Sequence, residues 1–464
     1  MARHVTELAS IALTWRESCH RRRERVAEFA VHATPLDDGE MTLLTTQLKA
    51  SLALLALSAG LAHADEAALS LKQAGALALA HNWDLLAAQA DLDQAEAQRL
   101  IAGALPNPEV SASLSKLGTT SGTSTHSRDG VLAISQLIEI GGKRGARIGS
   151  ARSGVAAARE RFRLAQLRLD AGLVKTYANA LAAQDSARIN RQSAASLSHS
   201  AEIADTRLNA GEISEVERDQ VRIAAGRFEG DAQAAEAGAT QARVALQLLV
   251  GAQKPDGRLN LSDDFQALDA VAERVSPEVE QGADWSGRVS ERGDVRAAAA
   301  DVERAEQDLR LQKAVRIPDP TFQAQYESEL PDTPRTFGVG VSFPLPLFSL
   351  NRGAIRAAEV TRASARRALD QVRAQAWAEI EAARVSFRAA LHKRNAYRDE
   401  LLPRALKVQQ TIAFAYEKGG ASLLELLEAE RSLNDVRLAA SSVSAELVSA
   451  AADLRAALGE EVVE

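Results

Sequence analysis

The sequence predicts a mainly α-helical protein with a small β part, in which one arrangement of elements occurs twice. Residues 144–209 run for 66 residues without a proline, and apolar side chains recur there at steps of seven or four: Val155, Phe162, Leu169, Leu173, Tyr177 and Leu181. Such a helix is a rod of about 100 Å. Short segments of alternating polarity precede this rod, and both features return later in the chain, which disfavours the alternative of an ordinary coiled coil.

Internal similarity defines the repeat. Two stretches recur 208 residues later: RGA at 144–146 returns at 352–354, and LQLLVG at 246–251 returns as LRAALG at 454–459. The turn PNP at 106–108 returns as PDP at 318–320, a shift of 212 residues. The difference of four places a length change in a loop between these landmarks. We therefore expect two units, residues 65–251 and 285–464, joined by an equatorial linker at 252–284.

The N-terminal region resembles a targeting segment. Residues 41–64 have a basic start at Lys49, an apolar stretch too short to span a bilayer, and a small-x-small cleavage site at Ala62 and Ala64. The alternative is a short buried helix. Residues 1–40 are then interpreted as an over-long start assignment, with a genuine basic extension as the second interpretation.

Composition excludes several classes of protein. The formal net charge is −7, without a cluster of basic residues in the mature chain, which argues against nucleic-acid binding. The single cysteine, Cys19, precedes the cleavage site, so the mature chain has neither a disulfide nor a lipid-modified N-terminal cysteine. No run of 18 apolar residues predicts a transmembrane helix.

Within each unit the expected order is helix, two strands, long helix, turn and long helix. Residues 70–104 form the first helix, broken near His81 and Asn82 and ended by the prolines that follow. Strands are expected at about 109–117, 130–140, 320–329 and 336–345, with a polar loop at 118–129. Gly141 and Gly142 in the first unit, and Pro344 and Pro346 in the second, bend the chain from strand to rod. The second rod is expected at 351–418.

The strands have one apolar and one polar face. In the second unit the apolar positions are Phe322, Ala324, Tyr326, Phe337, Val339, Val341 and Phe343. Eight to eleven residues match the length of a tilted strand that spans a membrane. Four strands cannot close a barrel, and lipid does not tolerate open edges, so a membrane interpretation requires several copies of the chain. The alternative is a pair of soluble hairpins packed on helices.

Both rods end in a tight turn. Gly211 and Gly419 are expected to end the helices in the left-handed conformation, and Ser214 and Ser422 to begin the next helices as capping boxes with Glu217 and Glu425. Acidic residues cluster after the turns. One interpretation is that they complement the helix dipoles. The other is an acidic ring at a pore mouth, for which the spacing of Glu425 and Glu428 places both side chains on one face.

Together these landmarks resemble the TolC family of outer-membrane efflux channels over nearly all of 65–464. The stretch GGASLLELLEAERSL at 419–433 is similar to the second periplasmic hairpin of that family. IGGKRGARI at 140–148 and PLPLFSLNRGAI at 344–355 resemble its heavy-metal efflux branch, the CzcC-like proteins.

The resemblance implies a homotrimer in the Gram-negative outer membrane. Each chain would give four strands to one transmembrane β-barrel in outer-membrane lipid, continuous with a long antiparallel α-helical barrel in the periplasm. A periplasmic adaptor (membrane fusion) protein and an inner-membrane resistance-nodulation-division-type pump would complete the path. The acidic pair at the family's periplasmic entrance aligns with Glu425 and Glu428. The arginine that latches the closed gate in relatives falls at Ala421, so the latch must differ.

The sequence offers little chemistry beyond transport. His81, His126, His199 and His392 are not at metal-ligand spacing, so we expect no metal site, no cofactor and no enzymatic activity. The glycines at 141–145 do not form a phosphate-binding loop. The expected function is a passive exit duct for metal cations or small toxic compounds. The alternatives are the duct of a type I protein secretion system and a soluble periplasmic coiled-coil adaptor.

Overall fold

The computed structural model describes residues 68–115, 128–268, 272, 285–330 and 335–461. They lie in one compact unit, Ala68–Glu464. The expected signal peptide with Ala62 and Ala64, the extension at 1–40 and almost all of the polar loop at 118–129 lie outside the described residues. So does most of the second half of the linker at 252–284.

Two consecutive helices open the described chain, and the expected break between them is confirmed. Helix α3 spans Leu71–His81 and helix α4 spans Trp83–Gly103. Ser70 caps α3 through a complete capping box with Gln73. Asn82 lies between the helices, where its side chain accepts a hydrogen bond from the Leu85 amide and donates one to the Leu249 carbonyl at 2.9 Å. At the break between the helices, the buried Asn82 therefore both caps α4 and ties it to the end of α6 (Glu215–Leu249).

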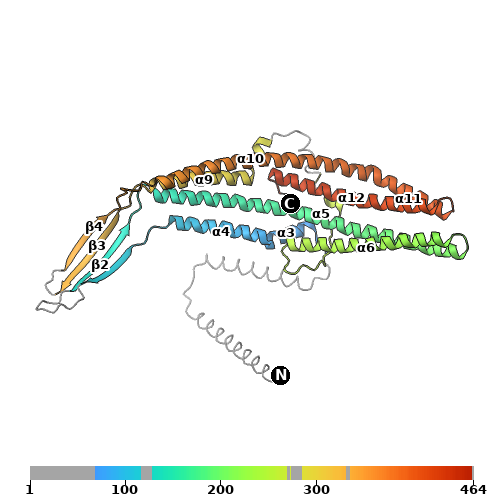
Figure 1. Ribbon diagram of the computed structural model, residues 1–464, viewed down its shortest axis with the longest axis horizontal. Coiled ribbons are helices and arrows are strands. Elements are labelled where there is room, and N and C mark those ends of the chain that lie inside the picture. Colours follow the sequence, from blue (N-terminus) through green and yellow to red (C-terminus); the bar gives the residue numbers. More distant parts are fainter. Residues whose placement is uncertain (1–67, 116–127, 269–271, 273–284, 331–334, 462–464) are drawn as a thin grey trace, which may run out of the picture. The chain divides into compact units, whose positions relative to one another are not determined.

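Four antiparallel strands form one sheet in the order β1-β2-β3-β4 (Figure 1). Their bounds are Glu109–Ser115, Arg128–Leu137, Thr321–Leu330 and Thr336–Ser342. The expected strands are confirmed, with shifts of a few residues at their ends. Strand β4 stops at Ser342 instead of residue 345, because Pro344 has no amide hydrogen to donate to a ladder.

The first rod is a single helix, as expected. Helix α5 spans Lys143–Asn209, and α6 returns over Glu215–Leu249. After the linker, α8 spans Trp285–Glu291 and α9 spans Gly293–Ala314. Helix α10 spans Arg352–Asn395, α11 spans Leu402–Glu417 and α12 spans Leu423–Leu458. Within the described residues, no proline or left-handed glycine lies inside these helices beyond the first turn.

The expected second rod at 351–418 is helical from Arg352 to Glu417, but it is not a regular α-helix throughout. A π-helical turn, Ala396–Leu401, separates α10 from α11. Pro403 follows this turn directly, and a proline in a helix removes one amide donor and clashes with the carbonyl four residues earlier. The wider π turn accommodates the proline while the chain keeps its direction. Pro403 was the sequence signal for this interruption.

The helices beside the sheet follow the order of the strands. Helix α5 packs between α4 and α9, and α9 packs between α5 and α10 (Figure 1). Toward the two turns, α6, α5, α12 and α11 pack in the same lateral order. Helix α4 with α6, and α10 with α11, therefore form the two opposite edges of the helical part.

The main core lies where α3, α5, α10 and α12 meet. It is built largely from alanine and leucine, with Tyr177 and Phe387 as its largest fully buried side chains. Small side chains let helices approach closely, which explains how a chain with 4% aromatic residues fills a core. The Tyr177 hydroxyl donates to the Leu69 carbonyl at 2.8 Å, and Leu69 pairs with Leu261 of the linker.

A buried polar layer continues the contact between α5 and α12. The Ser193 hydroxyl donates to the Asn434 side chain at 2.8 Å, and the Gln409 amide donates to Glu430 at 2.9 Å. Asn190, Ser193, Glu430 and Asn434 are each at most 7% exposed. Because buried polar groups need partners, this layer favours one register between the two helices.

A buried arginine joins the start of α9 to two other helices. Arg292 is 7% exposed and lies 2.6 Å from both Asp294 and Glu379. It also donates to the carbonyl of Ala457 at 2.8 Å. Burial alone would raise the pKa of Asp294, but the hydrogen bond and the charge of Arg292 outweigh it, and the pKa is lowered.

Replacing Asp294 by asparagine should destabilise the purified protein at pH 7 by about 1–3 kcal/mol, because Arg292 loses a charged partner inside the protein. The pKa of Asp294 is lowered on folding, so its contribution is present above the ordinary value of about 4 and is lost as the pH falls. Thermal melts followed by helical circular dichroism should show the difference from wild type at pH 7 and not at pH 2.

Glu379→Gln serves as the control, since the Glu379 side chain is 59% exposed and surface pairs contribute little. A difference for Asp294→Asn that persists unchanged at pH 2 would contradict this assignment.

Candidate functional site: an apolar sheet face, its junction and the helical turns

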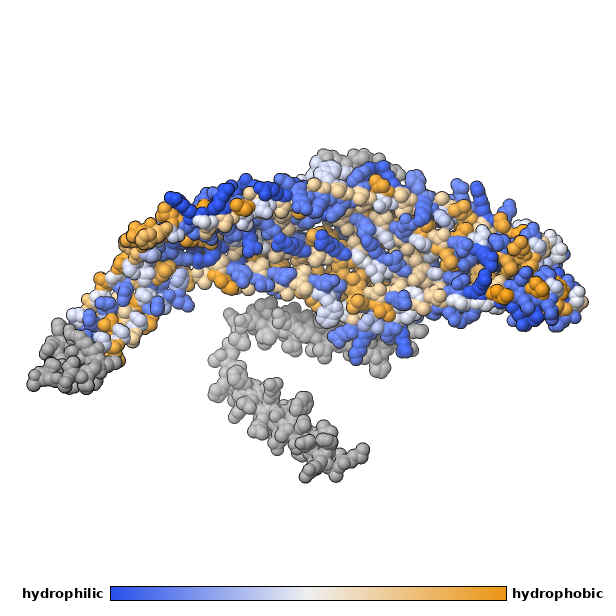
Figure 2. All heavy atoms as spheres, in the orientation of Figure 1, coloured by the Kyte–Doolittle hydropathy of each residue, from blue (hydrophilic) through white to orange (hydrophobic). Residues whose placement is uncertain are grey.

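One face of the sheet is apolar and exposed. The strand register places Val110 opposite Ile134, Ile134 opposite Ala324, and Ala324 opposite Val339, all on one face. Exposed fractions reach 85% for Phe337 and 92% for Val339. The other exposed apolar residues of this face are Val110, Leu114, Leu132, Ile134, Phe322 and Val341. Figure 2 shows hydrophobic residues gathered where the sheet meets the helices, and hydrophobic and polar residues side by side over the sheet itself.

The opposite face of the sheet is polar. It carries serines of β1 and the side chains of Gln323, Gln325 and Glu327 of β3. Tyr326 and Phe337 form a cross-strand ring pair on the apolar face, with centroids 5.1 Å apart. The alternative of hairpins that bury their apolar face against helices is therefore not what the described chain adopts. An exposed apolar face of this extent indicates a surface that contacts lipid or protein.

Both edges of the sheet are open within one chain. Among the described residues, β1 pairs only with β2, and β4 pairs only with β3. Each edge strand leaves a row of backbone amide and carbonyl groups without a strand partner. Within the described part of the chain, no helix is long and apolar enough to cross a membrane.

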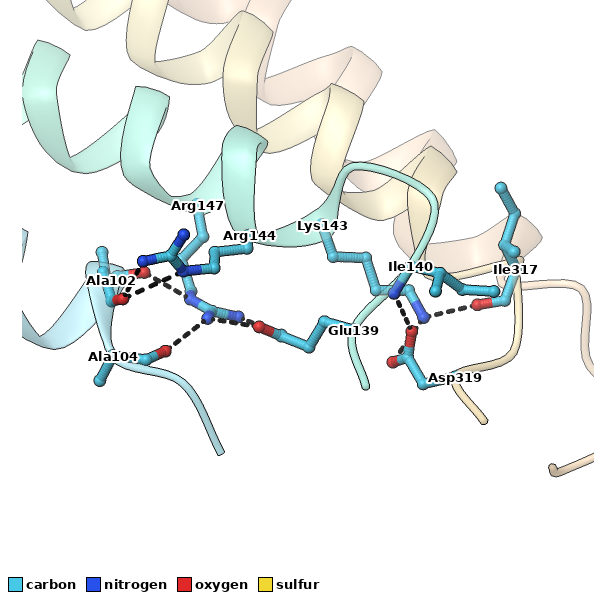
Figure 3. A network of polar contacts seen from close by, with 10 residues as sticks. Ala102, Ala104, Glu139, Ile140, Lys143, Arg144, Arg147, Ile317 and Asp319 are labelled. Atoms are coloured by element: carbon cyan, nitrogen blue, oxygen red, sulfur yellow. Dashed lines mark hydrogen bonds and ion pairs between the residues drawn. The ribbon is translucent and has the colours of Figure 1, made fainter. Parts of the chain in front are cut away.

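A compact network joins the sheet to the helices (Figure 3). Lys143, only 8% exposed, forms an ion pair with Asp319 at 2.7 Å and donates to the carbonyl of Ile317. Asp319 also accepts the amide of Ile140 at 2.9 Å. The start of α5 is thereby tied to the turn before β3, across 176 residues of sequence.

Two arginines of α5 complete this junction (Figure 3). Arg144 donates to the carbonyl of Gly103 at 2.8 Å, and Arg147 donates to those of Ala102 and Ala104. These are carbonyls at the end of α4 that lack helical partners, so the arginines cap that helix. Arg147 also holds Glu139 through two hydrogen bonds, at 2.6 and 2.9 Å. Sequence reasoning missed these roles, although the charged KRGAR stretch marked the place.

The expected bends lie at this junction. Gly141 and Gly142 both have positive φ, 72° and 79°, and Gly142 directly precedes α5. Pro344 and Pro346 lie in the irregular segment between β4 and α10. Apolar side chains of this segment are exposed, with Phe348 at 102%. The segment ends at Asn351, whose side chain donates to the Gln312 carbonyl at 2.8 Å.

Both tip turns have the expected left-handed glycines. Gly211 has a φ of 77° and Gly419 a φ of 74°. In each turn the next residue's amide reaches back to a helix carbonyl: Glu212 to Arg207 at 2.9 Å, and Gly420 to Ala415 at 2.7 Å. These bonds close the helix ends in the manner of a Schellman motif.

Only one of the two expected capping boxes is complete. Ser422 accepts the Glu425 amide, and its own amide donates to the Glu425 carboxylate at 2.7 Å. At the other turn Ser214 accepts the Glu217 amide at 3.2 Å, but the reciprocal bond is not formed. The prediction of a second full box was wrong, because the box needs a side-chain rotamer that the spacing of residues permits but does not enforce.

Glu425 and Glu428 have different surroundings. The backbone amide and then the hydroxyl of Ser422 bind the Glu425 carboxylate and lower its pKa. Glu428 is 64% exposed, and its nearest cation is Arg431 at 3.5 Å on the same helix. Glu425 is thus occupied as a cap, whereas Glu428 presents its charge to solvent. Among the described residues, no group of three acidic, histidine or cysteine side chains could hold a metal ion.

The two junction glycines allow a matched test of the bend. Alanine at either position must adopt a left-handed backbone, at a cost of about 1 kcal/mol. At Gly141 the added carbon would also lie 2.9 Å from the Ile317 side chain, whereas at Gly142 nothing lies within 4 Å.

Gly141→Ala should therefore reduce the free energy of unfolding of the detergent-purified protein by about 1 kcal/mol more than Gly142→Ala does. Thermal melts should show this as a clearly lower midpoint for Gly141→Ala. Equal midpoints for the two variants would contradict the close contact between Gly141 and Ile317.

The comparisons with known proteins agree with this architecture. The chain is 26% identical over 398 residues to the cobalt-zinc-cadmium resistance protein CzcC of Cupriavidus metallidurans, covering 84% of this chain and 90% of that protein. It is 29% identical over 314 residues to the nickel and cobalt resistance protein CnrC of the same organism, covering 66% and 69%. The crystal structure of the CmeC outer membrane channel of Campylobacter jejuni superposes with a TM-score of 0.71 at 20% identity, covering 85% and 87%.

A family model described as "Outer membrane efflux protein" matches residues 75–252 and 289–460. The localisation expected from the sequence, the Gram-negative outer membrane, is confirmed by these matches. With both matched segments spanning the described helices and strands, the chain belongs to the outer membrane efflux protein family.

Proposed function

We propose that the chain is the outer-membrane duct of a tripartite efflux system and carries metal cations or small toxic compounds to the exterior. The single observation that supports this most is the exposed apolar sheet face bounded by two open edges. Lipid can cover such a face, but it cannot satisfy the backbone groups of an edge strand. Pairing β4 of one copy with β1 of the next removes every edge once the ring closes.

In this proposal three copies form the closed barrel and a helical tunnel below it. The lateral order α4, α5, α9, α10 repeats the order of the strands, so closing the sheet also brings the outer helices of neighbouring copies together. The two repeated units would each give one hairpin and one pair of long helices. The tip turns at Gly211, Ser214, Gly419 and Ser422 would lie at the periplasmic entrance, facing an adaptor protein and an inner-membrane pump.

Metal cations are the proposed cargo on the strength of the relatives. The two resistance proteins that the chain resembles are named for cobalt, zinc, cadmium and nickel. The acidic side chains near the tips suit cations at a pore mouth. Within the tip pair, we assign the selective charge to Glu428, since Glu425 is held by Ser422.

A deletion strain tests the function directly. Loss of the gene should lower tolerance to cobalt, zinc, cadmium or nickel, and a plasmid copy should restore it. Val339→Arg should fail to restore tolerance, because an arginine on a lipid-facing strand position costs about 2–4 kcal/mol near the midplane.

Ser111→Arg is the matched control on the polar face and should restore tolerance like wild type. Unchanged tolerance in the deletion strain, combined with a defect in secreting a protein, would favour the type I secretion alternative. Equal behaviour of the two arginine variants would contradict the assignment of the faces.

The entrance assignment is tested in planar bilayers. Glu428→Gln should reduce the preference for cations over anions in single-channel recordings, whereas Glu425→Gln should change it less and mainly loosen the tip turn. The pKa of the Glu425 carboxyl is lowered in the folded protein. Its stabilising effect as a cap is therefore present above the ordinary glutamate pKa of about 4.3 and is lost as the pH falls below that value. An unchanged ion preference in Glu428→Gln would remove this residue from the pore mouth.

A further inference from the structure

The two outer edges of the helical part carry opposite charge. Helix α4 exposes Asp84, Asp91, Asp93 and Glu96 against one arginine, Arg99, a net charge of 1 − 4 = −3. The first half of α10, residues 352–373, holds six arginines against Glu359 and Asp370, a net charge of 6 − 2 = +4. In the described structure α4 packs on α5 and α10 packs on α9 and α12, so these charges lie on opposite sides (Figure 1).

Only part of this charge is neutralised within one chain. Glu96 lies 3.6 Å from Arg159, and Arg366 lies 2.6 Å from Glu306. Arg373 lies 3.7 Å from Asp370 of its own helix. Among the described residues, neither Asp84 nor Asp91 has an ion pair, and none is formed by Arg367. All three side chains are exposed. The remaining charges are available to a partner of opposite sign.

Positions on the two charged edges can be compared by their distance from the sheet. The strand register places Glu109 of β1 and Gly340 of β4 in one row of the sheet, through Ser135 and Gln323. Helix α4 runs toward this sheet and α10 runs away from it, so they are antiparallel, and both levels can be counted from the sheet end.

Counted in this way, the acidic and basic positions coincide. Asp91 lies 12 residues before the end of α4 and Arg367 lies 15 residues after the start of α10, about 18 and 23 Å along the helices. Arg373 does not share this position, because the six residues between it and Arg367 place it about 120° away around α10. A difference of about 5 Å between Asp91 and Arg367 is within the reach of an arginine side chain.

We propose that the acidic edge of α4 docks against the basic edge of α10 of a second copy of this chain, with Asp91 facing Arg367. The proposal rests on the ring assembly above and adds what selects it. Backbone edges alone do not distinguish β4–β1 pairing from β1–β1 or β4–β4 pairing, since all three can form antiparallel ladders. The charged helices do distinguish them, because the symmetric pairings would place acid on acid or arginine on arginine.

This complementarity makes the contact head-to-tail. A contact between two unlike surfaces generates a ring when the rotation closes, whereas a contact between like surfaces stops at a dimer. Long-range attraction between the edges would also orient two copies before their strands meet. We call this contact between α4 and α10 of neighbouring copies the seam. Its role is to select the correct neighbour, and the backbone hydrogen bonds between strands then hold the copies together.

Charge reversal tests the pairing. Asp84→Arg with Asp91→Arg should lower the fraction of heat-modifiable trimer in outer membranes about tenfold, and Arg367→Glu with Arg373→Glu should do the same. Combining all four changes should restore the trimer, because the two edges are again opposite in sign. Glu303→Arg, on the inner helix α9, is the control and should leave the trimer unchanged.

Chemical cross-linking gives a second readout that does not depend on reversal. In a Cys19→Ser background, Asp91→Cys with Arg367→Cys should give covalent trimers with a bismaleimide that spans about 10 Å, the usual separation of packed helices. Asp91→Cys alone should give none.

Several results would overturn the seam. They are trimers that persist in both two-site reversals, a four-site variant no better than either parent, or cross-linked dimers from Asp91→Cys alone. The proposed function fails separately, if the wild-type chain itself forms no trimer in the outer membrane. A wild-type trimer with unaffected reversal variants would reject only the charged seam.

Discussion

The backbone hydrogen bonds of two edge strands constrain the whole molecule. The sheet has four strands, and β1 and β4 end it with unpaired amide and carbonyl rows beside an apolar face. Water could satisfy these rows, but it would not cover Val339 and Phe337; lipid could cover the side chains, but it would not satisfy the backbone. Only further strands meet both needs. In the proposed assembly, strands of neighbouring copies meet both needs, and the long helices follow the same ring.

The junction shows how a flexible hairpin is aligned with a stiff helix. Two left-handed glycines turn the chain, and Lys143 then fixes the result by reaching Asp319 of the other half. The arginines that follow hold the end of α4. Because each contact crosses between segments distant in sequence, a shift of one strand must move α4, α5 and the turn before β3 together. These contacts therefore tie the first half of the chain to the second at the junction.

At the opposite end the same residue types serve two purposes. Glu425 and Glu428 are three residues apart on one helix, yet Ser422 binds the carboxylate of Glu425, whereas that of Glu428 is mostly exposed and lies 3.5 Å from Arg431. A single acidic residue after a turn is adequately explained by the helix start. The charge of Glu428, the residue beyond the capping box, has no such explanation, and we propose a cation entrance for it. Only part of the charge on α4 and on the first half of α10 has an ion-pair partner within the described part of one chain.

The sequence by itself determined the helices, turns and strand faces, because period, proline and glycine are local signals. It placed α5, the break at Asn82 and the left-handed glycines at 211 and 419 correctly, and Pro403 could have revealed the π turn as well. Only the tertiary structure decided the strand order and register, the pairing of Lys143 with Asp319, the incomplete box at Ser214 and the opposite signs of the two edges. These depend on which distant segments pack together, and no local pattern records that choice.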